Sequence, residues 1–306
     1  METILRTRKL TKTYKGKEVV NGVDMTVRQG EIYGFLGPNG AGKTTVMKMI
    51  TNLVKPTSGE VEVFGGKVTD GSYEMLKRMG SIIEYPVFYE RLSARENLLL
   101  HGEYMGYHNK QAIYEALELV KLHGIDNKPV KQFSLGMKQR LGIARAVMTK
   151  PELLILDEPI NGLDPVGIKE LREVFRMLSR DYGMTLLISS HILGEIEQIA
   201  DTVGVIKEGR LVKEVAMLQI REQNTEYIEL VTQNSGKAVY VLEHKLGLRN
   251  FKLTDGGAIR IYDAGVTPVE LNKALALEEV ELESVRKKYH SLEDYFMELI
   301  GGEHIA

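Results

Sequence analysis

The order of apolar and polar residues along the chain predicts where its strands lie. Residues 1 to about 35 alternate between the two kinds, with turns at Lys15-Gly16 and Gln29-Gly30, which predicts antiparallel strands. Short, largely apolar runs predict buried strands, and they lie at Ile32–Leu36, Ser81–Ile83, Leu153–Leu156 and Thr185–Ser189. Other strands are expected at Val61–Phe64, Val203–Ile206 and Leu211–Val212, the last two forming an edge hairpin.

Apolar residues at helical spacing lie between these runs. One predicted helix continues from Val46 to Lys55, where Pro56 stops it, and a short one covers Ser72–Met79. Residues from about 90 to 150 are almost entirely helical in pattern, and Ser93 to Glu96 forms a capping box. We therefore predict an α/β core with a helical subdomain inserted at about 85–150.

The last part of the chain has a different order of elements. A charged stretch, Ile220–Thr225, reads as a linker, which divides the chain into domains at 1–219 and 220–306. The strands and helices that follow, up to Val285, come in the order β-α-β-β-α-β, which is that of a ferredoxin-like α+β fold. A final helix is expected at Leu292–Ile300.

Composition narrows the possible classes of protein. The chain has 306 residues, of which 43% are hydrophobic, enough for about two packed domains. A net charge of −2 gives no basic field, so we expect no nucleic-acid partner. There are no cysteines, no N-terminal segment that looks like a signal peptide and no apolar run near the ~18 residues of a membrane span. We expect a soluble cytoplasmic protein that reaches a membrane through a partner.

One segment has the pattern of a phosphate-binding loop, G-x-x-x-x-G-K-[ST]. Its residues are Gly37, Pro38, Asn39, Gly40, Ala41, Gly42, Lys43, Thr44 and Thr45. A buried strand precedes it and a helix follows, so its backbone N–H groups can converge on phosphate oxygens at a helix N-terminus. Lys43 is expected to reach the β- and γ-phosphates of a nucleotide, and the Thr44 hydroxyl to coordinate Mg²⁺.

A second motif predicts hydrolysis. The apolar strand Leu153–Leu156 ends in Asp157-Glu158. Asp157 can hold Mg²⁺ and complete the metal site with Thr44. Glu158 can orient the attacking water and accept its proton, which favours hydrolysis over transfer to a substrate hydroxyl. Downstream, Asp164 caps a helix whose first residue is Pro165.

A third motif, Phe133-Ser134-Leu135-Gly136-Met137-Lys138-Gln139-Arg140, resembles the signature segment of the ATP-binding-cassette (ABC) ATPases, usually written L-S-G-G-Q. Only the Ser134-x-Gly136 core of that motif is retained. The resemblance covers residues 1 to about 215. It implies that Asn161–Asp164 is the D-loop linking two nucleotide sites, that His191 is the switch histidine contacting the γ-phosphate, and that Tyr14 stacks on adenine.

Glu84 departs from the family pattern, which usually has glutamine at this boundary of core and helical subdomain. A glutamate can still coordinate Mg²⁺, but it adds negative charge beside the γ-phosphate, so we expect an altered Mg²⁺ dependence. Together with the signature segment and Ser291–Phe296, Glu84 resembles one subgroup, the ATPases of bacterial bacitracin- and lantibiotic-resistance exporters.

The resemblance also implies partners. Two copies would pack head to tail, with ATP bound by the phosphate loop of one and by Ser134 and Gly136 of the other. A membrane permease would dock near Tyr85–Asn97, although each aromatic residue of Tyr85–Tyr89 is equally well explained as subdomain core. The leading interpretation is the ATPase subunit of a transporter that exports antimicrobial peptides or drugs. The alternatives are a soluble mechanoenzyme acting on ribosomes or DNA, and a small-molecule kinase, which Glu158 and His191 argue against.

Overall fold

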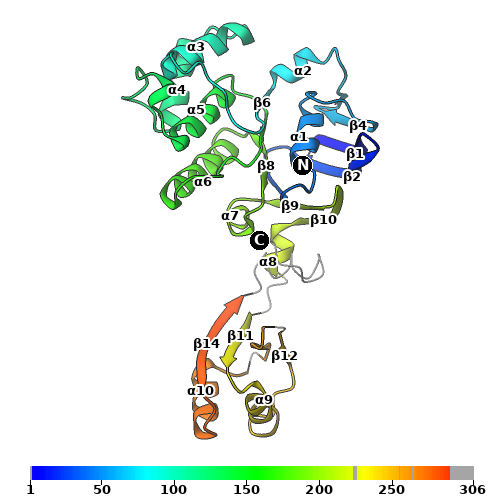
Figure 1. The fold of residues 1–306 in the computed structure, drawn as a ribbon, viewed down its shortest axis with the longest axis vertical. Helices are drawn as coiled ribbons and strands as arrows, with labels where there is room; N and C mark the ends of the chain where they lie inside the picture. The colour runs from blue at the N-terminus through cyan, green and yellow to red at the C-terminus, as the bar shows by residue number, and fades with distance from the viewer. Residues whose placement is uncertain (1, 223–225, 255, 264, 290–306) are drawn as a thin grey trace. The chain divides into compact units, whose positions relative to one another are not determined.

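A computed structural model describes residues 2–222, 226–254, 256–263 and 265–289. The chain forms two compact units, the first ending at Leu218 and the second beginning at Gln219 (Figure 1). Each unit has its own hydrophobic core.

A six-stranded sheet forms the centre of the first unit. Its strands, in spatial order, are β10 (Arg210–Ala216), β9 (Thr202–Lys207), β3 (Ile32–Leu36), β8 (Thr185–Ser190), β7 (Leu153–Leu156) and β6 (Met79–Ile82). All neighbours are parallel except β10, which is antiparallel to β9. Every residue of β3, β7 and β8 is buried, as the apolar runs predict. Each buried aliphatic side chain in such a strand contributes about 1.5–3 kcal/mol.

A second sheet is antiparallel and confirms the strands predicted at the start of the chain. Its strands, in spatial order, are β2 (Lys17–Arg28), β1 (Thr3–Tyr14), β4 (Ser58–Val63) and β5 (Gly66–Lys67). Apolar residues of β1, β2 and β4 share one core with the phosphate-loop helix and the central sheet.

Helices cover the sheets and form the predicted subdomain. The core helices are α1 (Lys43–Ile50), α2 (Tyr73–Lys77), α6 (Pro165–Arg180) and α7 (Leu193–Glu197). The subdomain contains α3 (Ala94–Met105), α4 (Lys110–Leu119), a 3₁₀ turn at Val130–Gln132 and α5 (Leu135–Val147). Figure 1 shows α3, α4 and α5 grouped together beyond the edge strand β6. The capping box at Ser93 and Glu96 is confirmed, with both reciprocal hydrogen bonds present.

Some predicted boundaries are wrong. Helix α1 ends at Ile50, not Lys55. Asn52 adopts a left-handed conformation (φ 57°), and the N–H groups of Leu53 and Val54 both bond to the carbonyl of Lys48. The chain therefore turns off before Pro56, and the exposed Leu53 gains no core contact that would extend the helix. Helix α2 ends at Lys77, because Met79 already belongs to β6.

The described part of the second unit has the predicted order of elements. These are β11 (Glu226–Thr232), α9 (Ser235–His244), β12 (Phe251–Leu253), β13 (Ile259–Ile261), α10 (Pro268–Leu277) and β14 (Leu282–Tyr289). The sheet order β12-β13-β11-β14 is antiparallel throughout. The expected linker is partly wrong, since Met217–Glu222 forms helix α8 and buries Met217 and Ile220. The helix expected at Leu292–Ile300 lies outside the described residues.

Candidate nucleotide-binding and hydrolysis site

The carboxyl ends of four parallel strands bring the predicted motifs to one edge of the central sheet. The phosphate loop follows β3, Glu84 lies shortly after β6, Asp157 follows β7 and His191 follows β8. Ligands in open α/β sheets bind at this edge, outside the carboxyl ends of the strands.

The phosphate loop requires glycine at particular positions. Gly42, the N-cap of α1, has φ 106°, a left-handed conformation that glycine adopts at least cost. A Cβ on Gly37 would lie 2.3 Å from the carbonyl oxygen of Ile206 in β9. The loop backbone is therefore fixed against the sheet, and the N-terminus of α1 faces the loop.

Lys43 is a buried cation surrounded by oxygen atoms. Its side chain is almost inaccessible, and its Nζ donates to the carbonyl oxygens of Gly37 (2.6 Å) and Pro38 (3.2 Å). The same Nζ lies 3.2 Å from Oε1 of Glu158. This ammonium group is therefore placed to bind an anion that enters the loop.

Thr44 and Asp157 meet directly. The Thr44 hydroxyl donates to Oδ2 of Asp157 at 2.7 Å, and the Ser189 hydroxyl donates to Oδ1 at 2.6 Å. Asp157 is only 3% exposed, so both carboxylate oxygens need these partners. A hydroxyl and a carboxylate in contact are hard oxygen ligands of the kind that Mg²⁺ prefers, with nucleotide phosphates completing its shell. Among the described residues no group of three or more His, Cys, Asp or Glu could hold a metal ion by itself. These residues therefore fit an Mg²⁺ ion bound together with a nucleotide.

Glu158 lies between a cation and a histidine. Its Oε2 is 2.8 Å from Nδ1 of His191, and its backbone has φ 48°, which turns the side chain toward the loop. Oε1 is buried beside the Lys43 ammonium, 3.2 Å from its Nζ. An ionised carboxylate accepts protons only, so Glu158 can take a proton from water once Lys43 turns to a bound phosphate.

Glu84 lies at the same edge but has a partner that the sequence analysis did not single out. A cleft of about 160 Å³ is lined by Thr44, Glu84, Tyr85, Gln139, Asp157, Glu158 and Asn161. The Glu84 carboxylate forms an ion pair with Lys48 of α1, with Nζ and Oε1 2.6 Å apart. Lys48 lies four residues after Thr44, on the same face of α1, and that spacing was the available signal.

The remaining predicted residues do not join this group within one chain. A second cleft, about 200 Å³, is lined by Val19, Asn39–Thr45 and Glu158. Neither cleft is lined by Ser134, Gly136, Asp164 or Tyr14. Ser134 and Asp164 instead cap α5 and α6, accepting hydrogen bonds from the backbone N–H groups of Met137 and Gly167. Tyr14 is partly exposed at the end of β1, with Lys12 over its ring.

Comparison with known proteins places the chain in a family. A sequence model of the ABC transporter family matches residues 20–161. The chain is 64% identical over 306 residues to an uncharacterized ABC transporter ATP-binding protein, YcbN of Bacillus subtilis, and the alignment covers all of both chains. The chain belongs to the ABC transporter ATP-binding proteins. This ABC protein is also 47% identical, over the full length of both chains, to the bacitracin transport ATP-binding protein BcrA of Bacillus licheniformis.

Solved structures agree with the family assignment. One, described as the ATP-binding subunit of an ABC transporter, is 32% identical, with a TM-score of 0.65, and the match covers 72% of this chain and 93% of the other. Another is the ATP-binding cassette MJ0796 in a dimeric post-hydrolysis state with ADP and phosphate, 26% identical, with a TM-score of 0.64, covering 70% and 99%. The P-loop core, the antiparallel sheet and the helical subdomain are thus those of an ABC cassette, and the protein is an ATPase.

Proposed function

We propose that this ABC ATPase powers a separate membrane permease that exports antimicrobial peptides or drugs. The similarity to the bacitracin transport protein BcrA, which extends through both units, supports an antimicrobial peptide as the transported molecule. The lantibiotic transport ATP-binding protein SrtF of Streptococcus pyogenes adds to this support, being 47% identical over 211 residues that cover 69% of this chain and 90% of SrtF. Hydrolysis is supported by one observation above all, the position of the Glu158 carboxylate between Lys43 and His191 at the phosphate loop.

The residues at this edge of the sheet account for the chemistry of hydrolysis. A water oxygen bonds to the γ-phosphorus of ATP while the bond to the β–γ bridging oxygen breaks, giving ADP and phosphate. Oε1 of Glu158 accepts the proton of that water, and His191 orients Glu158 and contacts the γ-phosphate. Lys43 exchanges its loop contacts for β- and γ-phosphate oxygens. Thr44 and Asp157 would hold Mg²⁺, which would supply positive charge to stabilise the transferred phosphoryl group.

A second copy of the chain completes each site in this proposal. Ser134 and Gly136 lie at the start of α5, where backbone N–H groups favour an anion, and Ser134 is exposed. Asp164 is exposed at the start of α6 and would link the two sites. Tyr14 would stack on adenine. The dimeric cassette MJ0796 supports this arrangement.

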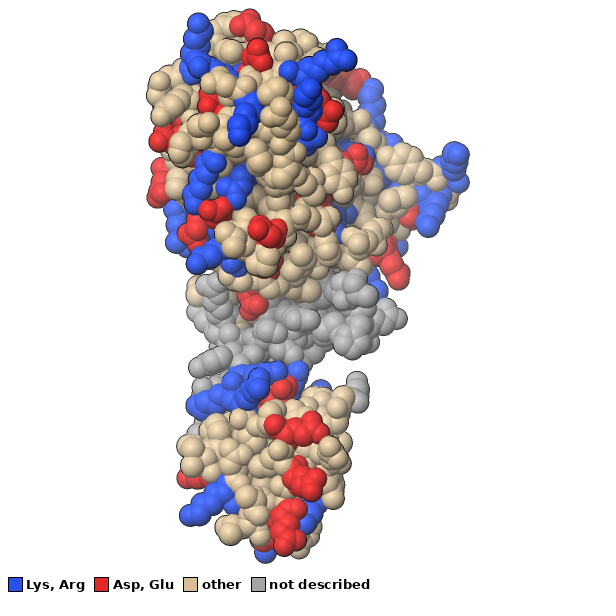
Figure 2. Space-filling model, turned by 60° about the vertical axis from the view of Figure 1, so that its left-hand side comes forward, with Lys and Arg blue, Asp and Glu red and all other residues tan. Residues whose placement is uncertain are grey.

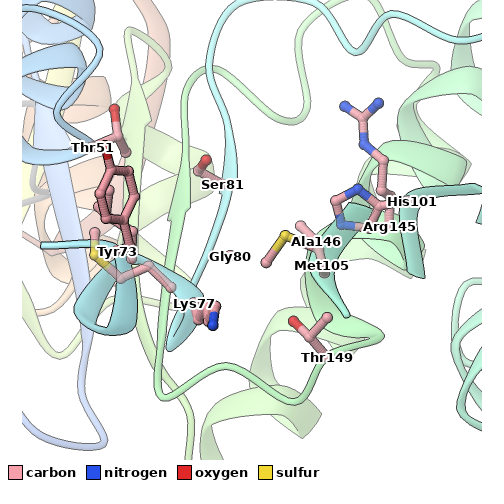
Figure 3. A pocket seen from close by; sticks show the side chains of 12 residues that line it. Thr51, Tyr73, Lys77, Gly80, Ser81, His101, Met105, Arg145, Ala146 and Thr149 are labelled. Carbon is pink, nitrogen blue, oxygen red and sulfur yellow. The ribbon is translucent and has the colours of Figure 1, made fainter. Parts of the chain in front are cut away.

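The surface near Tyr85–Asn97 is proposed to receive the permease. Tyr85, Val87 and Tyr89 are 69%, 80% and 56% exposed, which is not how subdomain core residues are placed. The Val87 carbonyl accepts a hydrogen bond from Arg145, which lines a cleft of about 320 Å³ between α2 and β6 on one side and α3 and α5 on the other. Figure 3 shows Tyr73 and Lys77 facing His101 and Arg145 across it. Exposed apolar and aromatic groups beside a groove of this kind suit a short amphipathic helix.

We call this cleft of about 320 Å³ the docking cleft, and its charge favours an acidic residue on the partner. Its lining includes Lys77, His101 and Arg145 but no Asp or Glu. The Arg145 guanidinium donates to the carbonyl of Val87 and stacks on Phe88, and burial lowers its pKa. Burial, and then the charge of Arg145, lower the pKa of His101, which favours its neutral form. A carboxylate on the docking helix would compensate the half-buried Arg145.

The proposal places the chain on the cytoplasmic face of the cell membrane, held there by the permease. No helix in the described ranges is long and apolar enough to cross a membrane. Lys and Arg are interspersed with Asp and Glu on the face of the first unit seen in Figure 2, which gives that face no continuous basic surface for nucleic acid.

Co-purification tests the permease assignment. The tagged chain is isolated from its detergent-solubilised host, and the bound proteins are identified by mass spectrometry. We expect a polytopic membrane protein among the bound proteins. The amount recovered should fall about tenfold when the chain carries Val87→Asp. Val269→Asp, at a similarly exposed valine of α10, serves as the matched control and should change nothing. Recovery of the chain on ribosomes or DNA, without a membrane protein, would instead establish the soluble mechanoenzyme.

A further inference from the structure

The ion pair between Lys48 and Glu84 joins two segments that each line two clefts. Helix α1 and its C-cap supply Thr44 to the cleft beside Asp157 and Thr51 to the docking cleft. Strand β6 and the residues after it supply Ser81 to the docking cleft and Glu84 to the cleft beside Asp157. The ion pair therefore links α1 to the segment after β6, and each of these two segments contributes residues to both clefts.

The geometry of the pair favours a functional role over a structural one. Nζ of Lys48 is 2.6 Å from Oε1 of Glu84, and the two side chains are 29% and 59% exposed. Exposed ion pairs contribute little to folding stability, since water screens them and both side chains lose rotamer entropy. Glu84 lines the cleft beside Asp157, and its left-handed backbone (φ 61°) directs its side chain toward α1.

The charge of the site shows why Glu84 needs this partner. Three carboxylates, those of Glu84, Asp157 and Glu158, line one cleft, which shares Thr44 and Glu158 with the cleft of the phosphate loop. Asp157 is held by Thr44 and Ser189, and Glu158 contacts Lys43 and His191. For Glu84, the described residues provide one partner, Lys48. An unpaired carboxylate at this rim would repel the phosphate charges across a site only partly screened by water.

We propose that Lys48 is a positioning residue that neutralises Glu84 and holds its carboxylate at the rim, away from the phosphates of ATP. Lysine at this place on α1 thus permits an acid beside the nucleotide site. The inference rests on the ATP site of the proposed function but does not require the permease. Without Lys48, the Glu84 carboxylate is left uncompensated and opposes nucleotide binding, most strongly when no Mg²⁺ accompanies the nucleotide.

A double-mutant cycle in ATP binding tests this role. All proteins carry Glu158→Gln so that bound ATP persists, and affinity is measured by calorimetry with ATP in EDTA and with ATP and excess Mg²⁺. In EDTA, Lys48→Met should weaken binding about fivefold, the size expected of one uncompensated charge acting across several ångströms of partly screened site. Glu84→Gln added to Lys48→Met should restore affinity to within about twofold, and excess Mg²⁺ should reduce the loss.

Controls separate this role from a general effect on the fold. Lys245→Met breaks a comparable pair in the second unit, Lys245–Glu278 at 3.0 Å, and should leave ATP affinity unchanged. An equal loss from Lys48→Met with and without Glu84→Gln would overturn the inference, because Lys48 would then act on ATP or on folding directly. An unchanged affinity in Lys48→Met would overturn it as well. If the Glu158→Gln parent bound no ATP at all, the assigned ATP site would fall together with the inference.

Discussion

The hydroxyl of Ser189 donates a hydrogen bond of 2.6 Å to Asp157 in the neighbouring strand. It also accepts the backbone N–H of Glu158 at 2.9 Å. Strands β7 and β8 are parallel, so their carboxyl ends lie side by side and place this hydroxyl between the two acids. One serine therefore orients both the acid expected beside Mg²⁺ and the acid expected to activate water.

Replacing Ser189 by alanine should reduce ATP hydrolysis about 10- to 100-fold, the usual effect of removing a group that orients a metal-binding carboxylate. The free energy of unfolding should also fall by about 1–3 kcal/mol, because a buried carboxylate loses a donor. Steady-state phosphate release and urea denaturation measure the two effects. Ser179→Ala, which removes a buried serine that donates to the carbonyl of Gly30, should affect only stability. Equal rates in both variants would contradict this role for Ser189.

The two cations beside Glu170 on α6 predict that this residue stabilises the fold in a pH-dependent way. It accepts hydrogen bonds from Arg140 of α5 and from Lys121, and these lower its pKa from 4.5 to about 2. Since the pKa is lower in the folded state, the stabilisation is complete above about pH 4.5 and is lost as the pH falls toward 2. The difference in unfolding free energy between wild type and Glu170→Gln should therefore shrink from pH 7 to pH 3.

Urea denaturation at several pH values, with the exposed Glu173→Gln as control, measures this difference. A difference that stayed constant or grew at acid pH would show that Glu170 does not stabilise the protein through its charge. Because Glu170 is partly exposed, solvent screening keeps the effect small.

The contact between Thr44 and Asp157 predicts how hydrolysis depends on Mg²⁺. Chelation by EDTA should abolish hydrolysis and be reversed by added Mg²⁺. Asp157→Asn should raise the Mg²⁺ concentration for half-maximal activity about 10- to 100-fold, because an amide is a weaker ligand than a carboxylate. Hydrolysis at full rate in EDTA would show that these residues do not serve a metal ion.

Much of the fold could be predicted from local sequence. The buried strand Leu153–Leu156 and the capping box at Ser93 follow from runs and spacings of a few residues, and the structure confirms both. The end of α1 could not be predicted this way, because Leu53 fits the helical pattern and only the tertiary structure leaves it exposed. The stretch Met217–Glu222 is helical and buries Met217 and Ile220, which its charged sequence does not indicate.

The site could be predicted only where a motif is continuous in sequence. The phosphate loop and Asp157-Glu158 each occupy a single segment, and the sheet brings them together as expected. The partners of Ser189 and Lys48 lie 32 and 36 residues away in the chain, so local sequence does not reveal them. Parallel pairing of β7 and β8 places Ser189 beside Asp157, and Lys48 on α1 meets Glu84 after β6. Ser134, Gly136 and Asp164 stay apart from the loop within one chain, so their proposed roles depend on a second copy.

ATP hydrolysis by the purified chain beside Glu158→Gln tests the central claim most directly, with gel filtration in ATP and Mg²⁺ run on the same samples. We predict that the variant binds ATP with near wild-type affinity, loses about 10²- to 10⁴-fold in hydrolysis because the water has no proton acceptor, and accumulates as a dimer. A Glu158→Gln protein that remained monomeric and hydrolysed ATP at the wild-type rate would contradict this account of the site.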